Sequence, residues 1–135
     1  MKPSLRIAEG YLYLELDGRE RAFIKFSADN GKLYILSTFV PESHRGRGLA
    51  GRLVEELLSF SERNGLSVVP LCSYAVSYFI KNRERRALLA EPYRSMSDEE
   101  LLRYYEERVR EESRRRQLRL EEPGRRESLD CPVCG

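Results

Sequence analysis

The hydrophobic residues of this chain follow two different periods, and the change between them constrains the fold more than any other feature. In the segment 21–26 the residues alternate, with Ala22, Ile24 and Phe26 on one face. Such alternation is typical of a strand with one buried face. From Leu49 onward, apolar residues recur every three or four positions, which indicates an amphipathic helix. We therefore predict an α/β domain in which strands come first and a helix follows.

Short turns join the early strands. The predicted strands cover residues 11–16, 21–26 and 33–40, and residues 4–8 add an edge strand before them. Asp17-Gly18 and Asn30-Gly31 lie between these strands, and both dipeptides suit the positive φ angles of a two-residue type I′ turn. The first 40 residues therefore predict an antiparallel meander.

A strand–helix–strand unit follows the meander. The apolar positions predict a helix of about 16 residues from Leu49, and Asn64-Gly65 ends it in the usual position for glycine. Residues 66–71 form a short apolar strand. We expect it to pair in parallel with strand 33–40 through a right-handed crossover. Residues 74–82 predict a second helix.

The charged residues gather in the last third of the chain. Residues 81–135 carry 27 charged side chains in 55 positions. We therefore predict a compact domain over residues 1–92 and a charged helical extension over residues 93–135. Ser97 and Glu100 have the spacing of a capping box, which predicts a helix from there to about residue 120. Its apolar stripe is narrow (Leu101, Leu102, Tyr105, Val109), and pairing two copies in a homodimer would cover it.

Composition excludes several classes of protein. The 135-residue chain has a net charge of only +2, so a wholly cationic, nucleic-acid-coating surface is excluded and a nucleic-acid partner is not expected. No apolar run reaches the ~18 residues of a membrane span, and residues 1–4 do not open a signal peptide. Three cysteines do not form a disulfide framework, so we expect a reducing, cytoplasmic location.

The segment 41–50 carries the clearest chemical signal. Gly46 and Gly48 precede the predicted helix start, where glycine lets the backbone approach a ligand closely. The free N–H groups and the positive end of the helix dipole then favour an anion. Arg45 and Arg47 add charge suited to phosphate. The alternative is a glycine-rich turn with solvated arginines.

Arg45-Gly46-Arg47-Gly48-Leu49-Ala50 resembles the acetyl-CoA loop of the GNAT superfamily of N-acetyltransferases, whose pattern is Arg/Gln-x-x-Gly-x-Gly/Ala. The order of predicted strands and helices matches as well. Residues 38–74, with Val40-Pro41 and the segment 69–72, are similar to the minimal single-domain branch of that superfamily. The resemblance covers roughly residues 5–92. It implies a GNAT-like fold, with the charged helix appended.

The resemblance implies an acetyl-CoA-dependent N-acetyltransferase acting on an unidentified amine. The backbone amides of residues 45–50 would cradle the CoA pyrophosphate, and Phe39 and Val40 would pair with pantetheine. Full-size members place helices between their first strands, whereas here Asp17-Gly18 leaves only a turn. The acceptor side should therefore be open, which suits a protein or peptide. The alternative function is a non-catalytic acyl-CoA-binding or RNA-associated module that uses the Arg-rich extension.

Two residues at strand ends are candidate catalytic groups. Cys72 closes the second parallel strand and His44 lies just beyond the first, so both are expected near one crevice. A thiol beside an imidazole would be an activated nucleophile that takes the acetyl group. Alternatively, His44 is a general base for direct attack by the amine. The competing roles are a small buried side chain for Cys72 and a loop-ordering residue for His44.

Two further features remain open on sequence alone. A tyrosine in the region of Tyr74 and Tyr78 often serves the wider superfamily as general acid, and Tyr78 is our candidate here, with packing as its alternative. Cys131 and Cys134 form half of a zinc-binding knuckle. Two copies of the chain would complete a four-thiolate site, whereas the alternative is a frayed end with incidental cysteines.

Overall fold

The computed structural model describes residues 4–8, 10–17 and 19–120 of the chain. Its centre is a five-stranded sheet with the strands side by side in sequence order. The first four strands are antiparallel, and the fifth is parallel to the fourth. Their bounds are β1 (Ser4–Ala8), β2 (Tyr11–Glu15), β3 (Arg21–Asp29), β4 (Lys32–Phe39) and β5 (Ser67–Pro70). This architecture confirms the predicted meander and the parallel pair.

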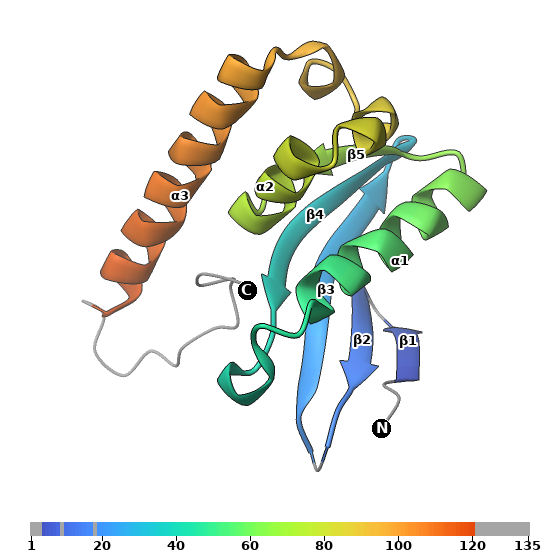
Figure 1. Cartoon of the computed structure of the whole chain (residues 1–135), viewed down its shortest axis with the longest axis vertical. Helices are drawn as coiled ribbons and strands as arrows, with labels where there is room; N and C mark the ends of the chain where they lie inside the picture. The colour runs from blue at the N-terminus through green and yellow to red at the C-terminus, as the bar shows by residue number, and fades with distance from the viewer. Residues whose placement is uncertain (1–3, 9, 18, 121–135) are drawn as a thin grey trace.

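In the described part of the chain, three α-helices accompany the sheet: α1 (Leu49–Arg63), α2 (Ser73–Lys81) and α3 (Asp98–Leu120). The short 3-10 helices are η1 (Glu42–His44), η2 (Arg83–Leu88) and η3 (Tyr93–Ser95). Figure 1 shows α1 and α2 in front of the sheet, and α3 beside α2 on the side away from α1. No helix within the described ranges combines the length and apolarity needed to cross a lipid bilayer.

The two predicted hairpin turns differ in outcome. Asp29 pairs with Lys32, and the residues between them, Asn30 and Gly31, have φ angles of 51° and 75°. This confirms a two-residue turn with both φ positive. At the other hairpin, the amide of Leu16 donates to the carbonyl of Glu20. More than two residues therefore separate the strands, and the two-residue turn predicted at Asp17-Gly18 is wrong.

The core lies between the sheet and the buried stripe of α1. Leu53, Val54 and Leu57 have no exposed area, and Leu58 is 1% exposed. They belong to one buried cluster with Leu12, Leu14 and Ile24 from the sheet and with other side chains. The helix ends as predicted, because Asn64 is its C-terminal cap and Gly65 follows with a φ of 65°. The core thus fixes α1 over the sheet.

The charged helix α3 begins as its sequence predicts. The amide of Glu100 donates to the Ser97 hydroxyl, and the amide of Ser97 donates to the Glu100 carboxylate. This is a reciprocal capping box. The residues of the predicted apolar stripe differ in burial, since Leu101 is fully buried whereas Leu102 is 47% exposed. The homodimer stays a prediction.

Candidate functional site

Strands β4 and β5 separate halfway along β4. Their parallel pairing covers only Lys32 to Ile35 on β4, and β4 continues to Phe39 beside β3. The amides of Leu71 and Cys72 both donate to the carbonyl of Ile35, at 3.0 and 3.1 Å, and the chain then turns into α2. Within the described residues β5 is the last strand, so no strand covers the edge of β4 beyond Ile35.

A glycine-rich loop leads from this open edge into α1. Gly46 and Gly48 have φ angles of 83° and 75°, which side chains other than glycine rarely adopt. A Cβ atom placed on either glycine would meet no atom within 4 Å, so both face open space. Gly48 is the N-terminal cap of α1 and gives it no side-chain hydrogen bond, and the first turn holds no acidic residue. The first amides of α1 are therefore available to an anion.

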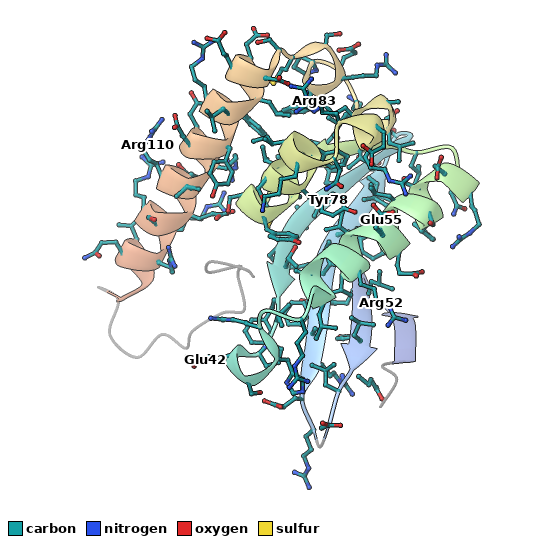
Figure 2. All side chains as sticks on the ribbon, viewed as in Figure 1. Glu42, Arg52, Glu55, Tyr78, Arg83 and Arg110 are labelled. Atoms are coloured by element: carbon teal, nitrogen blue, oxygen red, sulfur yellow. The ribbon has the colours of Figure 1, made fainter. Side chains whose placement is uncertain are left out.

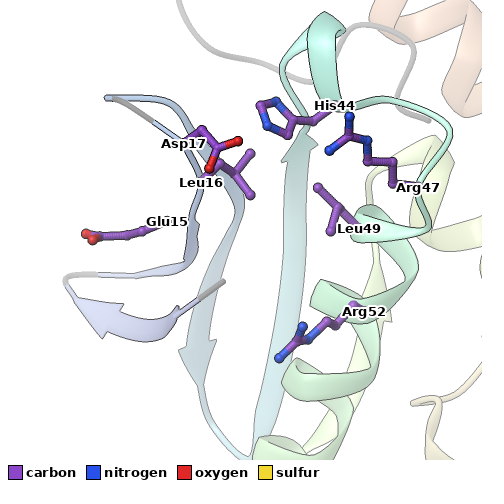
Figure 3. A pocket seen from close by; sticks show the side chains of 7 residues that line it. All are labelled: Glu15, Leu16, Asp17, His44, Arg47, Leu49 and Arg52. Atoms are coloured by element: carbon purple, nitrogen blue, oxygen red, sulfur yellow. The ribbon is translucent and has the colours of Figure 1, made fainter. Parts of the chain in front are cut away.

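Basic side chains surround the start of α1. Arg47 and Arg52 line a cavity of about 250 Å³ together with His44 and Leu49. Figure 3 shows these residues on one side of the cavity, and Glu15, the last residue of β2, with Leu16 and Asp17 just beyond it, on the other. Arg45 turns back instead, and its Nε donates to the carbonyl of Val40 at 3.0 Å. Arg45 thus holds the loop to the end of β4, whereas Arg47 and Arg52 supply guanidinium groups to this cavity.

The structure places His44 against the β2–β3 hairpin. It is 8% exposed, and its Nδ1 lies 3.0 Å from the Ser43 hydroxyl and 3.4 Å from the Glu20 carboxylate. Ser43 also donates to Glu20. These contacts tie η1 to the hairpin and favour the loop-ordering role for His44.

Cys72 lies in the core. Its side chain is fully buried, and its Sγ donates to the Thr38 hydroxyl at 3.7 Å. Burial raises the pKa of the Cys72 thiol above its ordinary value, and the Glu112 carboxylate raises it further. The amides of Ala75 and Tyr74 and the Thr38 hydroxyl oppose that rise but do not cancel it. A buried neutral thiol favours the packing role.

The structure does not bring Cys72 and His44 together as a pair. The thiol is bonded to Thr38 on β4, whereas the imidazole is bonded to Ser43 and Glu20. Among the described residues no hydrogen bond joins the two groups. The geometry therefore gives no support to a thiol activated by an imidazole.

Two tyrosines of α2 face α1 in different ways. The Tyr78 hydroxyl donates to the Glu55 carboxylate, which also accepts hydrogen bonds of 2.6 and 3.1 Å from Arg85. Figure 2 shows Glu55 and Tyr78 between the two helices. Burial, followed by this carboxylate, raises the pKa of the Tyr78 hydroxyl. Tyr74 lies one turn earlier, with its hydroxyl 3.5 Å from a Cβ atom placed on Gly51, in the first turn of α1.

Sequence reasoning missed Glu55, Arg85 and Glu112. Glu55 meets partners 23 and 30 residues later in the chain, and Glu112 meets Ser73, which is 39 residues earlier. On the sequence these three residues look like ordinary charged positions. No local pattern marks them, because their partners are set by how the helices pack.

Metal binding gains no support from the described residues. They contain no group of three or more His, Cys, Asp or Glu side chains that could hold a metal ion. Cys131 and Cys134, the predicted half of a zinc site, lie outside the described residues.

A family model described as GCN5-related N-acetyl-transferase matches residues 11–88, which is more than half of the chain. The match begins at the first residue of β2 and ends at the last residue of η2, so it includes the open edge of β4, the glycine-rich loop and both helices α1 and α2. It confirms the resemblance drawn from the sequence. Helix α3 lies beyond the matched residues.

The raised pKa of Cys72 predicts slow reaction with alkylating agents. Replacing Cys131 and Cys134 by Ser leaves Cys72 as the single thiol, and its alkylation rate by iodoacetamide is then measured against pH. Because the thiolate reacts and burial disfavours it, we expect the midpoint to lie above the ~8.5 of a free cysteine. An added Ser27→Cys thiol, at an exposed position, is the control. A midpoint below that of the control would contradict the buried neutral thiol.

Proposed function

Because the chain belongs to the GCN5-related N-acetyltransferase family, we propose that it transfers the acetyl group of acetyl-CoA to an amine. The observation that carries this proposal is the uncapped start of α1 beside the open edge of β4. Within the loop 45–50, the Arg45 amide already donates to the Glu42 carbonyl at 3.2 Å, so the amides of residues 46–50 bind the pyrophosphate. Arg47 and Arg52, which line the adjoining cavity, add positive charge. Phe39 and Val40 present the strand edge with which the amide groups of pantetheine pair.

The acetyl group passes directly to the amine. The amine nitrogen attacks the thioester carbonyl carbon, the carbon–sulfur bond breaks, and CoA leaves as a thiolate that takes up a proton. The amine nitrogen loses one proton in the same reaction. A covalent route through Cys72 needs an accessible thiolate, and the burial of that thiol argues against it. Cys72 packs in the core, and His44 orders the loop.

Tyr74 is the better placed of the two tyrosines to protonate the CoA thiolate. Its hydroxyl lies at the first turn of α1, and burial raises its pKa, so it keeps its proton at neutral pH. The proton of Tyr78, our candidate from the sequence, is directed at Glu55 instead. Tyr78 therefore joins α2 to α1 through Glu55, and its role is to hold the two helices together.

The two tyrosines can be compared by removing one oxygen from each. We expect Tyr74→Phe to lower kcat by about 10²-fold or more, the range for loss of a general acid, with little change in CoA affinity. Tyr78→Phe should lower the melting temperature, because it breaks the contact with Glu55, and should change kcat less. The measurements are steady-state kinetics and thermal unfolding of both variants. A larger loss of kcat in Tyr78→Phe would return the role to that residue.

The acceptor is proposed to be a protein or peptide amine. Only residues 16–20 connect β2 to β3, so no helix of the described chain stands at this hairpin. An acceptor site without helices beside this hairpin has room for a large partner. The location proposed for the reaction is the cytoplasm.

The competing function is a module that binds acyl-CoA without turnover. Binding of CoA raises the melting temperature of an enzyme and of a binder alike, so only turnover separates them. Release of free CoA is therefore measured with a panel of amines and peptides. Release that depends on the amine supports the enzyme, and tight binding without release from any amine supports the module.

Gly48→Val tests the loop itself. A branched side chain would stand in the open space before α1 and would block the pyrophosphate, so we expect CoA affinity to fall by tenfold or more, about 1.4 kcal/mol. Gly65→Val is the matched control, because Gly65 also has a positive φ and open space but lies at the opposite end of α1. Calorimetry and thermal unfolding are compared for both variants. Equal CoA affinity in folded Gly48→Val and Gly65→Val would show that the loop is not the site.

A further inference from the structure

Helix α3 holds the turn between β5 and α2 through three side chains on one of its faces. The Tyr104 hydroxyl donates to the carbonyl of Pro70, and the Arg108 Nε donates to the carbonyl of Leu71, each at 2.8 Å. The Glu112 carboxylate accepts from the Ser73 amide at 2.9 Å and from the Ser73 hydroxyl at 2.7 Å. These side chains are four residues apart, so they lie in one row along the helix.

The contacts match the polarity of the backbone that they meet. Tyr104 and Arg108 donate to carbonyl groups at the end of β5, whereas Glu112 accepts from the first amide of α2. A carboxylate at a helix N-terminus is favourable because it faces the positive end of the helix dipole. Hydrogen bonds to charged groups are stronger than neutral ones. The three side chains therefore bind this turn in one chain direction only and hold it in one position.

The same turn is bound on its other side by β4. The carbonyl of Ile35 accepts from the amides of Leu71 and Cys72. The segment 70–73 is thus held between β4 and α3, at the point where β5 leaves the sheet. Tyr74 follows at once, and its place beside the start of α1 depends on where this turn ends.

We propose that α3 is a working part of the transfer site, in which Arg108 and Glu112 are positioning residues that hold the β5–α2 turn and so place the Tyr74 hydroxyl. This inference rests on the proposed function. It assigns a role to a helix that lies beyond the part of the chain matched by the family. A helix that served only to bury apolar surface would have no need of these three polar contacts. Among the leucines of α3 whose burial is described, Leu101 is fully buried, whereas Leu102 and Leu118 are exposed.

The first test replaces each positioning residue by alanine. We expect Glu112→Ala and Arg108→Ala to lower kcat by about 10- to 100-fold, the range for a small misplacement of a reacting group. The affinity for CoA, set by residues 45–50, should stay within about twofold. Arg108→Lys keeps a donor and should recover part of the loss. Glu107→Ala and Arg110→Ala are controls, because both side chains are exposed, and Figure 2 shows Arg110 on the side of α3 away from α2.

A double-mutant cycle separates positioning from general stability. If Glu112 acts through Tyr74, adding Glu112→Ala to Tyr74→Phe should cause little further loss of kcat. A purely structural contact would lower kcat by the same factor in both backgrounds, which would overturn the inference. Wild-type kcat in folded Glu112→Ala and Arg108→Ala would overturn it as well.

A second readout does not depend on activity. In the background with Ser at positions 131 and 134, iodoacetamide reaches only Cys72, which lies in the held turn. We expect labelling at pH 8 to be several-fold faster in Arg108→Ala and unchanged in Glu107→Ala. Arg108→Ala decides this test, because Glu112→Ala also removes a carboxylate that raises the pKa of the Cys72 thiol and so speeds labelling by itself. Unchanged labelling in Arg108→Ala would overturn the inference. If the wild-type chain releases no CoA while the variants show the expected labelling, the proposed function is overturned. The inference that α3 holds the turn then still stands.

Discussion

The carbonyl of Ile35 ends the parallel pairing of β4 and β5, and the rest of the site depends on that ending. It accepts two amides, from Leu71 and Cys72, and the chain then leaves the sheet. Beyond this point β4 runs on for the length of Leu36–Phe39 without β5 beside it. An open strand edge is a binding surface for an extended ligand with amide groups. Helix α2 begins at the same turn, and side chains of α3 form hydrogen bonds with it.

The start of α1 provides the second half of the site. Its glycines keep side chains away from the space in front of the helix, and no acidic residue competes for its first amides. The core beneath α1 fixes this helix over the sheet, since its buried leucines have almost no exposed area. At the edge of that core, Tyr78 and Arg85 both donate hydrogen bonds to the Glu55 carboxylate, and the Tyr78 bond joins α2 to α1. The groups proposed for binding and for transfer are thus carried by two helices, and separate contacts set the position of each helix.

Local signals in the sequence predicted most of the elements. Three features depend only on residues that are neighbours in the chain, so the sequence alone predicts them. They are the capping box of Ser97 and Glu100, the Asn30-Gly31 turn and the end of α1 at Gly65. The Asp17-Gly18 turn was wrong because a suitable dipeptide does not exclude a longer connection, which here is closed by the Leu16–Glu20 hydrogen bond. The site was less predictable. Glu112 reaches a partner 39 residues away, and the burial of Cys72 follows from how β4, β5 and α2 pack together.

The central claim is that acetyl-CoA binds between the open edge of β4 and the start of α1. Its most direct test is the change in backbone amide chemical shifts when CoA is added to isotope-labelled protein. The account predicts the largest changes in residues 45–50 and at Phe39 and Val40, with small changes on the opposite face of the sheet, where Tyr11 and Tyr13 stack. Changes confined to that aromatic face, with residues 45–50 unaffected, would contradict it.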